Sequence, residues 1–331
     1  MTMEEDKDQP PRHKPLGILL IFFAWLTYVI RLVFGWLNLS SAIPGLFAFR
    51  TGGGNMTFQF PNEIVPAPWV FIGVWQIIYA WGILWLIYVT ICICRKNSRG
   101  YFYVTPELFP TSFYVAWCLN NILIIFWIFL DDAKERIGAC MLLALIALTL
   151  YYQLYVSYCR MDQNGLWLTE NAPVDLWLIR ALVHNGLAIY ATWVTIATLL
   201  SFGAILTYDS GYDNEDTSTG MLTLLSIVIL VWFVLENFTA LERFCRYTLV
   251  PYVVVVVALA GLVDKYITFT GSLEPRNAVF ACVLLGVASL VLVARFSLVI
   301  WRHVTQPLYV NTMKTMSVKK SQVNGGFSTE L

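Results

Sequence analysis

The sequence has few charged residues and no excess of either sign. Only 13% of its 331 residues are charged, and 21 Lys and Arg balance 21 Asp and Glu. A net charge of zero argues against a nucleic-acid partner and gives no reason to expect an acidic one. In contrast, 58% of the residues are hydrophobic and 15% are aromatic, which is typical of a polytopic helical membrane protein and not of a soluble domain.

The sequence also lacks the motifs of the common enzyme and metal sites. It has no nucleophile elbow, phosphate-binding loop, HExxH motif or carboxylate pair. Its seven cysteines all fall within or at the inner ends of predicted helices, so a disulfide framework is not expected, and no Cys/His cluster has metal-ligand spacing. We therefore expect neither a catalytic residue nor a metal site, and we expect that the protein is not an enzyme.

Eight apolar runs meet the length of about 20 residues that a transmembrane helix needs. They predict an all-α polytopic membrane protein whose surroundings are the lipid bilayer. The runs cover residues 16–37, 69–94, 112–130, 137–158, 176–206, 221–240, 248–263 and 278–301. Most connections are short, so consecutive helices should pack as antiparallel neighbours.

Basic residues predict the orientation of these spans. With the N-terminus inside, the inner segments hold thirteen Lys and Arg and the outer segments hold five. This bias predicts that both termini are cytosolic. Residues 1–15 would be a cytosolic N-terminal tail and residues 302–331 a cytosolic C-terminal tail. The acidic residues of the N-terminal tail are unusual for a mitochondrial transit peptide.

The second span begins with a distinctive stretch. Pro66 and Pro68 predict an extended approach, and Pro68 suits the first turn of a helix. At 3.6 residues per turn the helix has two aromatic faces, which we interpret as a packed side and a side open to a ligand. The first face holds Trp75, Tyr79 and Gly82, and the second holds Trp81, Trp85 and Tyr88.

Tryptophans from several spans should meet in the outer half of the bundle. Flat indole rings around an apolar cavity suit a large planar or rigid hydrophobic ligand. The candidate ligand-binding residues are Trp69, Trp75, Tyr79, Asn120, Trp127 and Trp193. Core packing is the alternative for the deep aromatic residues, an interface belt for Trp69, and helix–helix hydrogen bonding for Asn120.

Charged residues inside spans need partners, because they are costly in hydrocarbon. Arg180, Glu236 and Arg295 fall at a similar inner depth, and we expect them to form an ion cluster. We favour a structural clasp over a proton relay. His184 is one turn from Arg180 and is expected to be a packing residue.

Two hydrophilic segments carry short motifs. Asn55, in the sequon Asn55-Met56-Thr57 of the long first outer loop, should accept a glycan. The chain ends Ser328-Thr329-Glu330-Leu331, in which Thr329 and Leu331 match the C-terminal ligand form of PDZ domains. Such a partner would favour a plasma-membrane or endomembrane location over the mitochondrial outer membrane.

Three stretches carry a family resemblance. The spacing Pro-x-x-Trp-Val-x-x-x-Val-Trp-x-x-x-Tyr from Pro66 to Tyr79 resembles the signature of the translocator protein family, also called peripheral benzodiazepine receptors or tryptophan-rich sensory proteins. Residues 119–127 and 193–201 resemble its third-helix and fifth-helix patterns. The sequence departs from the family at Gly73, Leu123 and Ser201, which replace a proline, a tryptophan and an asparagine.

The resemblance implies a five-helix membrane core over residues 16–206, followed by three additional helices over residues 207–301. It also implies a pocket, open toward the first loop, for a porphyrin or haem-like molecule, a sterol or a similar hydrophobic ligand. The function expected first is therefore binding of such a ligand, with a role in transport or sensing. A signalling or scaffolding protein is the second hypothesis and a porphyrin-modifying enzyme the third. The oligomeric state, a homodimer included, is left open.

Overall fold

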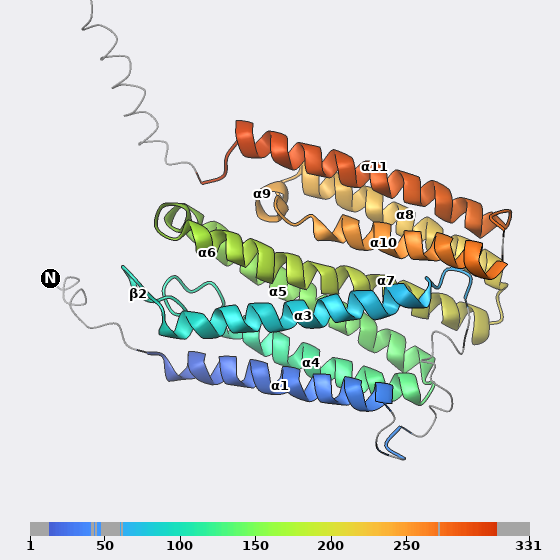
Figure 1. Cartoon of the computed structure of the whole chain (residues 1–331), viewed down its shortest axis with the longest axis horizontal. Coiled ribbons are helices and arrows are strands. Elements are labelled where there is room, and N and C mark those ends of the chain that lie inside the picture. Colours follow the sequence, from blue (N-terminus) through green and yellow to red (C-terminus); the bar gives the residue numbers. More distant parts are fainter. Residues whose placement is uncertain are drawn as a thin grey trace, which may run out of the picture.

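The computed structural model describes residues 13–40, 43, 45–47, 60, 62–270 and 272–309, and nearly all of them are helical (Figure 1). A two-residue antiparallel pair, β1 and β2, joins the second and third long helices and pairs Lys96 with Tyr101. The elements are α1 (Pro15–Ser40), α3 (Pro68–Cys94), β1 (Lys96–Asn97), β2 (Gly100–Tyr101), α4 (Thr111–Asp132), α5 (Arg136–Asn171), α6 (Pro173–Leu178), the π-helix η1 (Ile179–His184), α7 (Asn185–Tyr208), α8 (Asn214–Phe238), α9 (Glu242–Cys245), α10 (Val250–Lys265), the π-helix η2 (Tyr266–Thr270) and α11 (Arg276–Thr305).

Eight helical stretches in the described residues are long and apolar enough to cross a bilayer, with mean hydropathy between 1.8 and 2.5. Each matches one of the eight predicted runs. The stretch from α6 through η1 to α7 counts as one span, as does α10 with the start of η2. The protein is therefore an all-α, multi-pass integral membrane protein.

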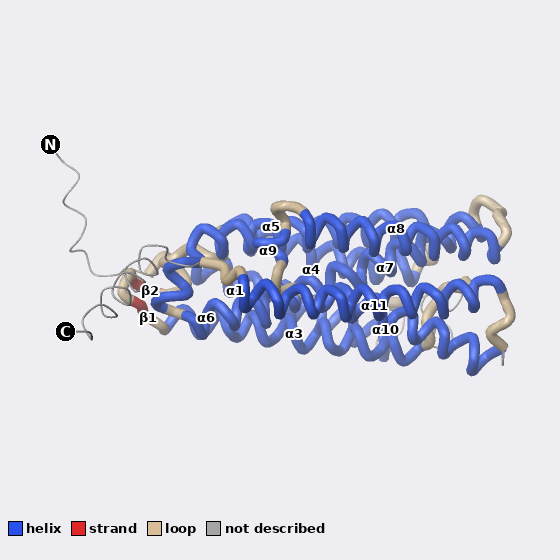
Figure 2. Tube along the Cα trace, turned by 90° about the horizontal axis from the view of Figure 1, so that it is seen from above, coloured by secondary structure: helices blue, strands red, loops and turns tan. Residues whose placement is uncertain are grey.

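The long helices run side by side along one axis in both views (Figures 1 and 2). In Figure 1, α8, α10 and α11 lie on one side, α1, α3 and α4 lie on the other, and α5 and α7 lie between them. Helix α7 contacts α3 and α5 as well as α8 and α10, so it forms a wall shared by both groups. The start of α1 and the end of α11 lie at the same end of the bundle.

The core of the first group is aromatic. Trp85 of α3 packs edge-on against Trp117 of α4 at 4.7 Å between ring centres, and both are enclosed. The Tyr28 hydroxyl of α1 donates to the Tyr79 carbonyl at 2.8 Å. One of the two aromatic faces of α3 was predicted to be packed and the other open to a ligand. The second face is packed at Trp85.

Helix α3 begins as the prolines predict. Ala67 is extended, with φ −56° and ψ 147°, and Pro68 occupies the first helical turn. The Ala67 amide donates to the Gly261 carbonyl of α10 at 2.9 Å. A Cβ on Gly261 would lie 2.1 Å from Cγ2 of Val70, so the glycine permits the close approach of α3 and α10.

Several helices extend beyond their apolar runs, among them α8, which begins at Asn214 and not at residue 221. Helix α5 continues past Tyr158 to Asn171, and the next helix begins at Pro173, before the predicted start. The polar extension is fixed by other segments: Asp162 of α5 accepts hydrogen bonds from Arg243, and Asp175 of α6 accepts two from Arg95, at 2.6 and 2.8 Å. A hydropathy pattern detects the part of a helix that lies in hydrocarbon, not its continuation into water.

Candidate functional site

Trp75 stands at the centre of an aromatic group, in the half of the first five spans that the sequence predicts to be the outer one. Its ring stacks on Tyr79 of the same helix at 5.7 Å and on Trp127 of α4 at 6.4 Å. Tyr190 of α7 meets it edge-on at 6.0 Å. Helices α3 and α4 therefore contribute nearly parallel rings, a geometry that favours stacking with another flat molecule, and α7 adds an edge-on contact.

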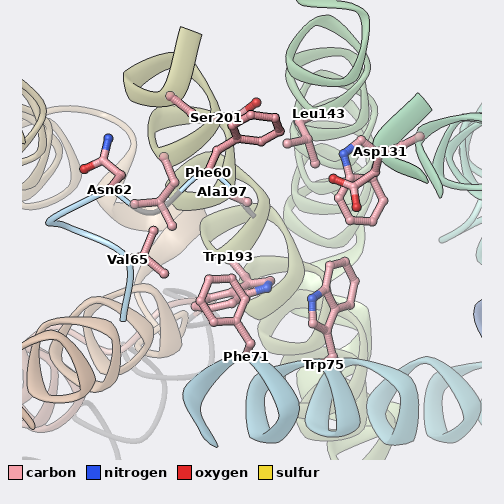
Figure 3. A pocket seen from close by; sticks show the side chains of 13 residues that line it. Phe60, Asn62, Val65, Phe71, Trp75, Asp131, Leu143, Trp193, Ala197 and Ser201 are labelled. Carbon is pink, nitrogen blue, oxygen red and sulfur yellow. The ribbon is translucent and has the colours of Figure 1, made fainter. Parts of the chain in front are cut away.

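A cavity of about 60 Å³ lies on the outer side of this group (Figure 3). Trp75, Trp127 and Trp193 line it, and Phe71 packs edge-on against Trp193 at 5.2 Å. The remaining lining residues are Phe60, Asn62, Val65, Asp131, Leu143, Ala197, Leu200, Ser201 and Ala204. Most of them are apolar, so the cavity favours a hydrophobic molecule.

Polar groups of the cavity gather near its outer end. The Asn62 Oδ1 atom accepts from the Ser218 hydroxyl at 2.7 Å and from the Ile64 amide at 3.1 Å. Among the described residues, the buried Asn62 Nδ2 and Trp193 Nε1 atoms have no hydrogen-bond partner. Buried donors without an acceptor are uncommon in proteins, so the cavity has unused capacity to bind an acceptor oxygen.

The structure brings together three of the six predicted ligand-binding residues on the cavity wall, Trp75, Trp127 and Trp193. Tyr79 lies behind Trp75, in contact with it.

Trp69 and Asn120 lie elsewhere, and here the sequence prediction is corrected. Trp69 is 52% exposed, and its Nε1 donates to Asp264 of α10 at 2.9 Å. Trp75 follows Trp69 by six positions, which turns the two side chains about 120° apart around the helix. Asn120 is fully buried and donates to the Ile146 carbonyl and the Thr149 hydroxyl of α5, at 3.1 and 2.8 Å. Asn120 therefore links α4 to α5 by hydrogen bonds, which was the alternative predicted for this residue.

Two of the three residues of the predicted ion cluster form an ion pair, and the third, Arg180, lies apart from them. Arg295 and Glu236 form an ion pair at 2.6 Å, and neither is exposed. Arg180 is not part of it, which corrects the three-residue prediction. Its guanidinium lies over the rings of Trp177 and Tyr247, at 4.7 and 4.0 Å from their centres. Equal depth along the sequence does not place side chains in contact, because they point from different helix faces.

The remaining predicted sites, Asn55, Thr329 and Leu331, lie outside the described residues. Among the described residues, no group of three or more His, Cys, Asp or Glu side chains is arranged to hold a metal ion.

Arg31, a buried charged residue in the middle of a span, was missed by the sequence analysis. Arg31 lies within α1, is 2% exposed, and has its guanidinium 5.9 Å from the Trp75 ring centre and 4.7 Å from that of Tyr190. The signal was present, because Arg31 is the one charged residue between positions 15 and 40. An ionisable residue within a span is a candidate for function by default.

One comparison with known protein families gave a match. The family of TSPO-like proteins matches residues 21–296. The chain belongs to the TSPO-like protein family. The match runs from α1 into α11, so it covers the last three spans as well as the first five. No curated protein and no solved structure gave a match.

Proposed function

We propose that this TSPO-like membrane protein binds a hydrophobic, planar or rigid small molecule in the cavity beside Trp75. The observation that supports this most is the convergence of Trp75, Trp127 and Trp193 from three helices on one largely apolar cavity. Tryptophans at this depth are beyond the reach of an interface belt, and the stacked rings of Trp75 and Trp127 suit a porphyrin or a sterol.

The cavity has to widen for such a ligand. A volume of about 60 Å³ holds roughly two water molecules, whereas sites for organic ligands span about 300–1,000 Å³. Phe60, Asn62 and Val65, which precede α3, line the cavity together with helical residues. We infer that displacement of this segment opens the cavity toward the outer end of the bundle.

Thermal stabilisation of the purified full-length protein by protoporphyrin IX and by cholesterol tests this proposal. Trp75→Ala should weaken binding of the stabilising ligand by about 1–3 kcal/mol, because one stacked indole is lost. Trp301→Ala is the matched control, since Trp301 is 54% exposed at the end of α11. Equal loss from both substitutions, or no stabilisation of the wild-type protein by either ligand, would reject the proposed pocket.

The biological role that we propose is transport or sensing of the ligand, not its chemical conversion. The sequence supports this through its lack of enzyme motifs, and family membership is consistent with it. Loading vesicles with the ligand tests transport: release that depends on the protein and is absent in Trp75→Ala supports it. Formation of a product from the ligand would instead favour the porphyrin-modifying enzyme.

We further propose that both termini face the cytosol, in the plasma membrane or an endomembrane. The charge bias of the connections supports this orientation. Strand β2, which follows Arg95, lies at the same end of the bundle as the start of α1 (Figure 1). Arg95 pairs with Asp175 of α6, and Arg243 of α9 pairs with Asp162 of α5.

A further inference from the structure

Arg31 is buried in the five-span core without a carboxylate partner. Its Nη1 donates to Asn121 Oδ1 at 3.3 Å. Its Nε and Nη2 atoms have no hydrogen-bond partner in the part of the chain that the structure describes. No ion pair among the described residues includes it. Arginine stays protonated in proteins, so the charge itself persists.

Aromatic rings surround this guanidinium on several sides. Its carbon lies 4.7 Å from the ring centre of Tyr190, 5.4 Å from Tyr79, 5.7 Å from Tyr28 and 5.9 Å from Trp75. The ring faces attract a cation and offset part of its desolvation. They provide no oxygen acceptor for the free N–H groups, so the compensation is incomplete.

Arg295 shows how the same protein compensates a buried arginine that has a structural task. Its guanidinium donates to Glu236 at 2.6 Å, to Asn237 at 2.7 Å, and to the carbonyls of Cys245 and Arg246 at 3.0 and 3.2 Å. The carboxylate of Glu236 thereby compensates the charge of Arg295, and most N–H donors of its guanidinium have an acceptor. Arg31 has one long hydrogen bond to an amide and no anion, although it is equally enclosed.

The cavity next to Arg31 also contains buried N–H donors without an acceptor. Trp75 contacts the guanidinium on one side and lines the cavity on the other, so a single side chain separates the two. Trp193 Nε1 and Asn62 Nδ2, which are also without partners among the described residues, are donors as well. Arg31 and the cavity thus present several buried hydrogen-bond donors, and we expect the ligand to contain the acceptor atoms.

We propose that Arg31 is the anion-binding centre of the pocket and pairs with the carboxylate of a hydrophobic ligand. The inference rests on the proposed function and specifies its ligand class: a hydrophobic carboxylic acid. The ligand body would stack among Trp75, Trp127 and Trp193, while the carboxylate accepts from the Nε and Nη2 atoms of Arg31, a paired geometry that suits guanidinium and carboxylate.

The charges of the cavity fix the direction in which such a ligand lies. Asp131 lines the outer part of the cavity, ten residues after Asn121, the amide partner of Arg31. Ten helical residues correspond to about 15 Å. A carboxylate is attracted by Arg31, so it should enter first and lie deep. Rotation of the Trp75 side chain joins the cavity to Arg31.

Paired acids and esters test the charge directly in the wild-type, full-length protein in detergent. The probes are protoporphyrin IX with its dimethyl ester, and oleic acid with methyl oleate. We expect at least one acid to bind about tenfold or more tightly than its ester, as for a hydrogen-bonded charge. The two pairs distinguish a tetrapyrrole from an acyl chain as the ligand body. Equal affinity of acid and ester in both pairs would overturn the role of Arg31.

Substitutions of Arg31 test whether this residue causes the preference for the acid over the ester. Arg31→Gln should reduce the acid-to-ester ratio to about one, chiefly by weakening binding of the acid, and Arg31→Lys, which keeps the charge but not the fork, should give an intermediate ratio. Arg180→Gln is the matched control, since Arg180 is also buried and forms no ion pair among the described residues. A ratio that persists in Arg31→Gln would overturn the proposal.

Failure of this inference differs from failure of the pocket. If acid and ester bind equally and Trp75→Ala weakens both, the pocket stands and Arg31 is not its anion-binding centre. If no acid or ester binds the wild-type protein, both the pocket and the anion site are rejected. Should Arg31→Gln not fold, judged by thermal unfolding, the wild-type ratio and that of Arg31→Lys decide.

Discussion

The carboxylate of Glu236 on α8 accepts a hydrogen bond from Arg295 on α11 at 2.6 Å, in a position where neither side chain is exposed. The hydroxyl of Tyr252 on α10 donates to the same carboxylate at 2.7 Å. One acidic group thereby connects all three helices that follow the five-span core. Two of the three residues of the predicted ion cluster therefore meet, without Arg180.

Removal of one partner of this pair should destabilise the protein strongly. Glu236→Ala leaves the Arg295 charge buried and uncompensated, and we expect a loss of about 3–5 kcal/mol in the free energy of unfolding. Thermal or denaturant unfolding in detergent measures it. In the double variant Glu236→Leu with Arg295→Met most of the loss should be recovered. A double variant as unstable as Glu236→Ala would show that the charge is not the cause.

Substitution of Gly261 should separate α3 from α10. In Gly261→Ala the new methyl group would lie 2.1 Å from Cγ2 of Val70, so the backbones have to move apart and strain the Ala67–Gly261 hydrogen bond. Overpacking of this kind costs about 1–3 kcal/mol, measurable by unfolding. Val70→Ala in the same chain should restore part of the stability, and an unaltered unfolding temperature in Gly261→Ala would contradict the contact.

The Arg136–Asp209 ion pair predicts an acid-dependent component of stability at the outer end of α5 and α7. Hydrogen bonds from Arg136 lower the pKa of Asp209 below its usual value, with Nε at 2.7 Å from Oδ2. The stabilisation is complete above the unfolded pKa of about 3.9 and is lost as the pH falls through the lower folded pKa. Since the pair is partly exposed, the effect should stay below about 1 kcal/mol.

Arg136→Gln tests this component. The wild-type protein should lose more unfolding temperature between pH 6 and about pH 3 than the variant does, because the variant has no pair to lose. Arg276→Gln, which removes a more exposed arginine, serves as the control. Equal acid sensitivity of wild type and Arg136→Gln would assign the loss to other groups.

The predicted orientation has a direct test in cells. Asn55 should carry a glycan, because the first outer loop would face the lumen or the exterior. A glycosidase-sensitive gel shift that disappears in Thr57→Ala would support the prediction. A C-terminal tag that antibody reaches in intact cells would contradict it, since an even number of spans places both termini on one side.

The sequence by itself determined the number, the order and most of the boundaries of the membrane helices. Apolar length is a local property, and water, hydrocarbon and the backbone hydrogen bonds of a helix act on each segment independently. The start of α3 was likewise predictable, because Pro66 and Pro68 restrict their own backbone. Family membership could be anticipated from Trp69, Trp75 and Tyr79, whose spacing is a property of the chain alone.

Only the tertiary structure decided which of these residues meet. All faces of a membrane helix are apolar, so the sequence does not show how a helix is turned against its neighbours. For that reason Trp69 turned toward α10 while Trp75 turned into the core, and Arg180 separated from Glu236. In the sequence, Arg31 is a single charge in an apolar run. Only the packing of the helices shows that its guanidinium lies among four aromatic rings, contributed by α1, α3 and α7.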